Sequence, residues 1–208
     1  MRLTISDWRL QKNMYDLSII ILASGLSKRM GQNKLLMDFK GKKMYQHCIN
    51  SVKKSDIRQK IVVSAYNEIL EYAGNMGDFI LVKNENQALG QSQSIKMGIA
   101  TAKPCLGFVF LPSDMPFITD VFLNKLCDFF MQDTSCIVVP RIEGKNSMPT
   151  IFPFSLYDEL SNISGDIGGR DIIKANLSKV RYFDVSEGNI LQDIDTMEDF
   201  EKYTDEQR

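Results

Sequence analysis

A run of small residues followed by three cations is the part of this chain whose residue types are best suited to chemistry. Residues 23–25 read Ala-Ser-Gly, and Lys28, Arg29 and Lys34 follow closely. Small side chains let the backbone approach a ligand, and exposed N–H groups bind phosphate oxygens. The cations would neutralise a triphosphate, whose charge otherwise repels an attacking nucleophile. We therefore expect a triphosphate site here, although a solvated basic turn explains the loop alone equally well.

Asp114 follows an apolar run, residues 107–111, in the sequence Pro-Ser-Asp-Met-Pro. A carboxylate at the end of a buried strand is held rigidly, and Mg²⁺ typically takes one or two such carboxylates together with phosphate oxygens. We therefore expect Asp114 to bind Mg²⁺. The alternative is a turn aspartate that hydrogen-bonds its own backbone ahead of Pro116.

Asp193 and Asp195 alternate in the chain just before a predicted C-terminal helix. Thr196 and Asp199 form an acidic variant of the capping box, which predicts the start of that helix. Alternate residues of an extended segment share a face, so either aspartate could complete the magnesium site that Asp114 begins. An acidic helix start that complements the helix dipole is the alternative interpretation.

Two segments that contain glycine stand at other predicted helix starts. Gly90 is followed by Ser92 and Ser94, whose hydroxyls could meet a base or a phosphate or could simply cap the helix. Residues 165–170 form a glycine-dense turn that ends in a cation. This second segment is either an acceptor-binding loop or a tight turn.

Short apolar runs alternate with helix-like stretches along the chain. The strand candidates, rich in β-branched and aromatic residues, are 17–22, 60–64, 79–82, 107–111, 135–139, 150–152 and 180–185. The helix candidates, identified by apolar spacing, are 44–54, 68–76, 92–102, 120–131 and 170–176, with a last helix through about residue 204. This order and the continuously apolar strands predict an α/β fold, a doubly wound sandwich whose ligands bind beyond the carboxyl ends of the strands.

The charge balance and the hydropathy exclude several classes of protein. The 208 residues include 25 Lys plus Arg and 26 Asp plus Glu, a formal charge of −1 without the basic excess typical of nucleic-acid binders. The longest apolar runs fall short of the ~20 residues of a membrane helix, and the first residues lack a secretory signal. We therefore expect a cytoplasmic protein of one domain, with neither nucleic acid nor membrane as partner.

The cysteines and the histidine argue against several catalytic mechanisms. The four cysteines form no C-x-x-C pair, so we expect free thiols rather than a zinc or redox site. His47 is the single histidine and lies in a predicted helix, away from the strand ends. A structural role for His47 is expected, which excludes mechanisms that depend on a histidine.

Five motifs, in this order, resemble those of the molybdenum cofactor cytidylyltransferases, which belong to the molybdopterin nucleotidyltransferases. They are residues 22–31 with Lys34, 90–94, 111–116, 165–170 and 193–199. The resemblance covers about residues 17–204 and implies a Rossmann-like three-layer sandwich with a mostly parallel sheet, of the nucleotide-diphospho-sugar transferase type. Residues 17–208 would form one nucleotidyltransferase domain. Residues 1–16 would form an N-terminal extension, either ordered or disordered.

The resemblance also implies a reaction, in which CMP passes from CTP to the phosphate of molybdopterin and pyrophosphate is released. Arg29, Lys34 and Asp114 would be the catalytic residues, and Asp193 or Asp195 would join Asp114 at Mg²⁺. The nucleotide-binding residues would be Leu22, Ala23, Ser24, Gly25, Lys28, Arg29, Lys34, Gly90, Ser92 and Ser94. The acceptor-binding residues would be Asp166, Gly168 and Arg170. The product would pass to a molybdenum hydroxylase apoenzyme, and the protein would be a monomer or a weak homo-oligomer.

The choice of base rests on two positions. Guanylyl-transferring members of the family carry two glycines where this chain has Ala23 and Ser24, whereas cytidylyl-transferring members carry two alanines. A Cβ at Ser24 favours the smaller base. The alternatives are the same chemistry with GTP and molybdopterin, CTP with a sugar or polyol phosphate, a non-catalytic molybdopterin carrier, and a regulatory nucleotide sensor.

Overall fold

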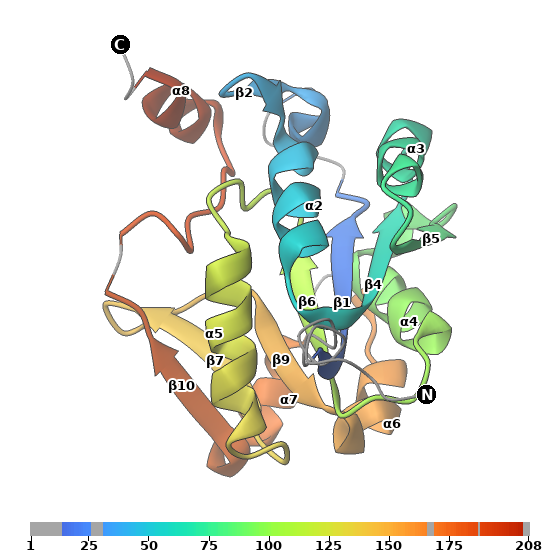
Figure 1. Ribbon diagram of the computed structural model, residues 1–208, viewed down its shortest axis with the longest axis vertical. Helices are drawn as coiled ribbons and strands as arrows, with labels where there is room; N and C mark the ends of the chain where they lie inside the picture. Colours follow the sequence, from blue (N-terminus) through green and yellow to red (C-terminus); the bar gives the residue numbers. More distant parts are fainter. Residues whose placement is uncertain (1–13, 26–30, 166–168, 187, 206–208) are drawn as a thin grey trace, which may run out of the picture.

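The structure is a computed structural model that describes residues 14–25, 31–165, 169–186 and 188–205. Within these residues an eight-stranded sheet forms the middle layer, in the order β10-β7-β9-β6-β1-β4-β5, with β8 paired to β7 (Figure 1). The strands are β1 (Tyr15–Ala23), β4 (Ile57–Ser64), β5 (Phe79–Lys83), β6 (Gly107–Pro112), β7 (Ile137–Ile142), β8 (Lys145–Asn146), β9 (Thr150–Pro153) and β10 (Val180–Asp184).

Most neighbouring strands are parallel. β1 runs parallel to β4 and β6, β4 to β5, and β7 to β10, whereas β9 is antiparallel to both β6 and β7, and β8 is antiparallel to β7. The carboxyl ends of β1, β4, β5 and β6 therefore lie at one edge of the sheet. This edge is where an open α/β sheet binds its ligands.

Helices cover both faces of the sheet. They are α2 (Met44–Lys54), α3 (Asn67–Asn75), α4 (Gln91–Thr101), α5 (Asp120–Met131), α6 (Tyr157–Ser161) and α7 (Arg170–Ala175), whereas α8 (Met197–Asp205) packs in a separate cluster. Apolar side chains of α2, α3 and α5 pack on one face, and those of α4, α6 and α7 pack on the other. The expected three-layer α/β fold with a mostly parallel sheet is confirmed.

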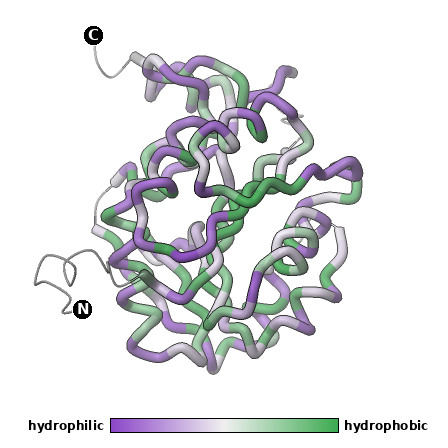
Figure 2. The backbone as a smooth tube through the Cα atoms, turned by 45° about the vertical axis from the view of Figure 1, so that its right-hand side comes forward, coloured by the Kyte–Doolittle hydropathy of each residue, from purple (hydrophilic) through white to green (hydrophobic). Residues whose placement is uncertain are grey.

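The residues of β1 explain why both faces are covered. Ile19 and Ile21 belong to the cluster under α2, α3 and α5, while Ile20 and Leu22 belong to the cluster under α4. A strand whose successive side chains are apolar on both faces cannot leave either face in water. Figure 2 shows the same pattern, with hydrophobic strands inside and hydrophilic turns around them.

A smaller structural unit lies beside the carboxyl edge of the sheet. The hairpin of β2 (Asp38–Phe39) and β3 (Lys42–Lys43) lies at the same end of the molecule as α8 (Figure 1). Phe39, Met44, Ile194 and Tyr203 form a separate buried cluster there. This cluster anchors the segment that leads into α8.

Most predicted boundaries agree closely with the structure, but β4 begins at Ile57 rather than at residue 60, and two further strands need correction. The strand expected at 135–139 is β7, Ile137–Ile142, because the Asp133 carboxylate accepts hydrogen bonds from the Ser135 N–H and hydroxyl and holds that residue in a turn. Strand β1 begins at Tyr15, so the last residues assigned to the N-terminal extension belong to the sheet. Residues 1–13 lie outside the described residues.

Two further expectations concern membranes and thiols. No helix among the described residues combines the length and the apolarity needed to cross a bilayer. The four cysteines are all described and are free thiols, as expected: Cys48, Cys105, Cys127 and Cys136.

Candidate active site

Lys34 lies between two carboxylates beyond the carboxyl edge of the sheet. Its Nζ is 2.7 Å from Asp114 Oδ2 and 2.7 Å from Asp195 Oδ1. Lys34 begins a 3-10 turn, η2 (Lys34–Leu36), which Asn33 caps by accepting a hydrogen bond from the Leu35 N–H. Burial by itself lowers the pKa of an amine, but the attraction of Asp114 and Asp195 prevails and the pKa of Lys34 is raised. The ammonium is therefore charged at neutral pH.

Asp114 is positioned by its backbone as well as by Lys34. The preceding Ser113 donates hydrogen bonds from its N–H and its hydroxyl to the Leu22 carbonyl, which ties the loop to the end of β1. The Asp114 carbonyl accepts a hydrogen bond from the Ile194 N–H at 3.1 Å. Asp114 Oδ1 is buried and has no hydrogen-bond partner among the described residues. A buried carboxylate oxygen without a partner is costly unless a ligand satisfies it.

Asp193 and Asp195 face the same space because Ile194, between them, points the other way. Ile194 is fully buried in the cluster with Phe39 and Tyr203, whereas both aspartates line the cavity described next. The residue Asp193 as a whole is exposed to solvent, but the surrounding chain partly shields its carboxylate from water. This partial burial, followed by repulsion from Asp195 and Asp114, raises its pKa.

The capping box that leads into α8 is formed as expected. The Thr196 N–H donates to Asp199 Oδ2 at 2.9 Å, and the Asp199 N–H donates to Thr196 Oγ1 at 3.1 Å. The Asp195 N–H also donates to Asp199 Oδ2, at 3.3 Å. The backbone on the carboxyl side of Asp195 is therefore fixed.

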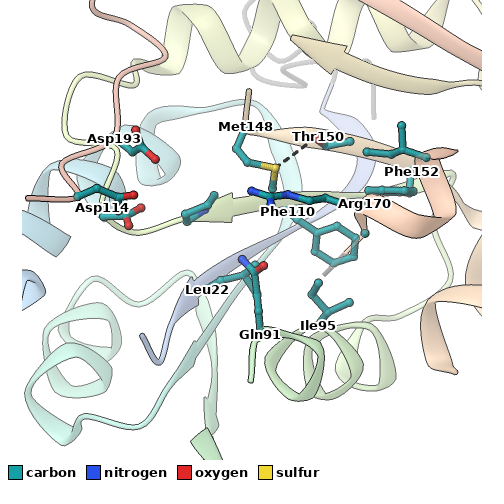
Figure 3. A pocket seen from close by; sticks show the side chains of 14 residues that line it. Leu22, Gln91, Ile95, Phe110, Asp114, Met148, Thr150, Phe152, Arg170 and Asp193 are labelled. Atoms are coloured by element: carbon teal, nitrogen blue, oxygen red, sulfur yellow. Dashed lines mark hydrogen bonds between the residues drawn. The ribbon is translucent and has the colours of Figure 1, made fainter. Parts of the chain in front are cut away.

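A cavity of about 290 Å³ begins at these carboxylates and continues over the face of the sheet that α4 covers (Figure 3). Asp114 and Asp193 lie at one end of it. Apolar side chains such as Met148 and Ile173 form one wall, and Arg170, the first residue of α7, reaches into the cavity. The cavity therefore combines an acidic end, an apolar wall and a cation.

The residues at the acidic end fit a divalent cation that is shared with a ligand. No group of three His, Cys, Asp or Glu residues that could hold a metal is present among the described residues. Mg²⁺ needs one or two protein carboxylates when phosphate oxygens and water supply the rest. Asp114, with its unpartnered buried oxygen, and Asp193, whose charge its neighbours disfavour, meet that requirement.

Those expected nucleotide-binding residues that the structure describes lie at the same edge of the sheet. Ser24 is buried, and its hydroxyl donates to the Val63 carbonyl at 3.4 Å. Gly90 precedes α4 with φ of 86°, a conformation that favours glycine. Ser92 and Ser94 are also buried, and Ser94 Oγ accepts a hydrogen bond from the Asn84 amide at 3.0 Å.

A family model described as a MobA-like NTP transferase domain matches residues 19–180. The chain belongs to this family. The match contains Lys34 and Asp114 and ends before the segment of Asp193 and Asp195. Membership of a nucleotidyltransferase family, expected from the motifs, is thereby confirmed.

Individual relatives carry more specific names. A probable molybdenum cofactor guanylyltransferase of Natranaerobius thermophilus is 35% identical over 132 residues, 62% of each chain. Purine catabolism protein PucB of Bacillus subtilis is 25% identical over 193 residues, 88% of this chain and 93% of that protein. The chain thus spans less than two thirds of the length of the guanylyltransferase that it matches. That relative is named for guanylyl transfer, so the cytidylyl specificity expected from the motifs of this chain stays a prediction.

A solved structure supports the fold. A nucleotidyl transferase from Methanothermobacter thermautotroptrophicus (Mth528) has a TM-score of 0.76 to this chain at 19% identity, covering 91% of this chain and 96% of that one. The likeness confirms the α/β architecture.

Several expected site residues of this MobA-like domain lie outside the described residues. Lys28 and Arg29 fall in 26–30, and Asp166 and Gly168 fall in 166–168. Their roles stay predictions. Arg170, the last expected acceptor-binding residue, is described and lines the cavity.

Some residues that line the cavity of the MobA-like domain were not expected from the sequence. On α4 they are Gln91 and Ile95, one turn apart, rather than Ser92 and Ser94. From the segment that enters β9 they are Met148, Thr150 and Phe152. These residues alternate in the sequence, and this spacing indicates a shared strand face. The apolar composition of the segment obscured that pattern.

His47 has the structural role that the sequence suggested. Its Nε2 lies 2.7 Å from the Phe39 carbonyl, and its ring packs edge to face against the Phe39 ring. These contacts join α2 to the β2–β3 hairpin.

Proposed function

We propose that this protein transfers CMP from CTP to the phosphate of molybdopterin and releases pyrophosphate. The observation that carries the proposal is the placement of Lys34 between Asp114 and Asp195 at the end of a cavity that also contains Arg170. A cation and several carboxylates in one partly buried place suit a metal-bound triphosphate. Membership of the MobA-like family supplies the reaction class.

The choice of CTP rests on the end of β1. Ala23 is fully buried and Ser24 nearly so, and the Ser24 hydroxyl is directed to the Val63 carbonyl. Ser24 therefore adds a Cβ to the loop, while its hydroxyl donates a hydrogen bond to the backbone of β4. This supports a smaller base than the two glycines of a guanylyl-transferring loop would accept.

The reaction requires positioning and charge stabilisation more than a general base. An oxygen of the molybdopterin phosphate attacks the α-phosphorus of CTP, the new P–O bond forms, and the bond to the β-phosphate breaks with pyrophosphate as leaving group. The attacking phosphate oxygen is already ionised near neutral pH, so no histidine is needed. Lys34 would stabilise the negative charge that develops on the transferred group.

The metal site is part of the proposal. Asp114 together with Asp193 or Asp195 would hold Mg²⁺, whose charge, when bound, would polarise the phosphate oxygens. Lys34 already holds one oxygen of Asp114 and one of Asp195, so the chain fixes the geometry of these carboxylates. Asp114 Oδ1 has no hydrogen-bond partner among the described residues, so it is the oxygen best placed to bind the metal.

The cavity supports molybdopterin as the acceptor. The half-buried side chains of Met148 and Ile173 line this cavity and offer apolar surface to a flat ring system. Arg170 offers a planar cation that can bind a phosphate through two parallel hydrogen bonds. The expected roles of Asp166 and Gly168 in acceptor binding belong to the same proposal.

Transfer of GMP from GTP is the second candidate. The observation in its favour is the name of the Natranaerobius relative, a probable guanylyltransferase that is 35% identical to this chain. The two candidates differ in the base and share the acceptor and the chemistry.

Ligand-induced stabilisation discriminates the nucleotides. We expect CTP with Mg²⁺ to raise the melting temperature more than GTP, ATP or UTP, because a ligand that binds the folded state alone stabilises it. Preferential stabilisation by GTP would favour the second candidate. The absence of a shift with every nucleotide would contradict both.

A further inference from the structure

The loop that ends β1 is tied to the end of β4 by two side-chain hydroxyls. Ser64 Oγ donates to the Ala23 carbonyl at 2.9 Å, and Tyr66 Oη donates to the Gly25 carbonyl at 3.0 Å. The Tyr66 N–H donates to Ser64 Oγ at 3.0 Å, which leaves the Ser64 proton for Ala23. The Ala23 and Gly25 carbonyls of the small-residue loop are therefore held from one neighbouring segment.

The same segment is tied on its other side to the start of α4. The Ser64 carbonyl accepts a hydrogen bond from the Asn84 N–H at 2.9 Å, and Asn84 Nδ2 donates to Ser94 Oγ at 3.0 Å. Asn84 Oδ1 accepts from the Asn86 N–H at 2.9 Å. Ser64 and Asn84 are essentially fully buried, so each of these polar groups would be costly to leave unpaired.

We propose that Ser64, Tyr66 and Asn84 are positioning residues that fix the two nucleotide-binding segments relative to each other. The inference rests on the proposed function, because the two segments, Ala23–Gly25 and Gly90–Ser94, are nucleotide-binding under that proposal. Ala23 ends β1, and the remaining residues of both segments lie beyond the sheet, where the backbone has few partners in it. Hydrogen bonds made before the ligand arrives remove the entropic cost of ordering both segments upon binding.

Tyr66→Phe tests the inference with the loss of one oxygen atom. We expect the dissociation constant and the KM for the nucleotide to rise about 2- to 10-fold, the range of one hydrogen bond, while kcat changes less than about twofold. Tyr72→Phe is the matched control, because the Tyr72 hydroxyl donates at 3.0 Å to Asn50, on α2. We expect Tyr72→Phe to leave nucleotide binding unchanged.

Asn84→Ala is a second variant that acts on the other side of Ser64. We expect weaker nucleotide binding, and the melting temperature of each variant is recorded without ligand to detect loss of the fold. If Tyr66→Phe binds the nucleotide as the wild type does, the inference is wrong whatever Asn84→Ala shows. If Tyr72→Phe weakens binding as much as Tyr66→Phe, the effect is general destabilisation and the inference is also wrong.

The titrations use CTP and GTP in parallel, each with Mg²⁺, so that the inference and the proposed function fail differently. If the wild type binds one of these nucleotides and the Tyr66→Phe variant binds it equally well, the positioning role fails and the proposed chemistry stands. If the wild type binds neither nucleotide, the proposed function fails and the inference fails with it.

Discussion

The ammonium of Lys34 lies 2.7 Å from a carboxylate oxygen of Asp195, although 161 positions separate the two residues in the sequence. The contact joins the loop after the first strand to the segment before the last helix. The burial of Ile194 and the capping box of Thr196 and Asp199 hold that segment in place. The site is therefore assembled from both ends of the domain.

Lys34→Met should remove the charge while keeping most of the side-chain volume. We expect turnover to fall at least 100-fold, because a group that stabilises transition-state charge contributes about that much or more. We also expect Mn²⁺ to bind more tightly without nucleotide, since Asp114 and Asp195 lose their shared counter-ion. Pyrophosphate release and Mn²⁺ titration measure the two effects. Lys125→Met, at an exposed position on α5, is the control, and turnover of Lys34→Met within tenfold of the wild type would count against this role.

Asp114→Asn should abolish catalysis and preserve the fold. Its backbone carbonyl, which anchors Ile194, is unchanged, so we expect far-UV circular dichroism like that of the wild type. Turnover should fall at least 100-fold, because the carboxylate proposed for the metal is gone. Asp158→Asn, at an exposed position on α6, is the control. A wild type that binds molybdopterin but never releases pyrophosphate would instead support the carrier hypothesis.

Arg170→Gln should weaken binding of the acceptor and leave binding of the nucleotide nearly unchanged. The Arg170 side chain reaches into the cavity from the first residue of α7. We expect the KM for molybdopterin to rise about 10- to 100-fold, with the KM for the nucleotide changed less than twofold. Lys174→Gln removes a cation from the same helix, where Lys174 pairs with Asp171 on the surface, and should change neither constant. An equal rise in both KM values for Arg170→Gln would contradict this assignment.

Most of the fold could be predicted because its longer elements carry their own periodic patterns, whereas the two-residue strands β2, β3 and β8 and the five-residue helix α6 were not predicted. The helices at 44–54 and 120–131 begin and end where the apolar spacing places them. The strand expected at 135–139 was displaced because hydrogen bonds that Ser135 donates to the Asp133 carboxylate override β-propensity, and hydropathy does not report such bonds.

The candidate site was predicted less completely than the fold. The roles of Asp114, Asp193 and Asp195 were expected from loop position, but the partnership of Lys34 with two of them depends on contacts distant in sequence. On α4 the motif drew attention to Ser92 and Ser94, whereas the rotation of the helix turns Gln91 and Ile95 to the cavity. Helix phase depends on how the helix packs on the sheet, which single-sequence patterns do not determine.

Alkaline pH should destabilise the protein through Tyr45, a fully buried residue of α2. Burial, followed by the Glu68 carboxylate, raises the pKa of Tyr45 to about 12. The unfolded chain loses this proton near pH 10, so the folded state binds more protons between pH 10 and 12, and stability falls as the pH rises through that range. We expect the stability advantage of the wild type over Tyr45→Phe, measured by urea unfolding, to shrink by about 1 kcal/mol from pH 8 to pH 11. A pH-independent difference would contradict this expectation.

Transfer of a labelled phosphate is the most direct measurement of the proposed function. The protein is incubated with molybdopterin, Mg²⁺ and either CTP or GTP labelled at the α-phosphate. The product is then isolated and identified by mass spectrometry. We expect the label to move from CTP into a molybdopterin cytosine dinucleotide, with one pyrophosphate released for each product. Transfer from GTP but not from CTP, or no transfer from either nucleotide, would contradict the account.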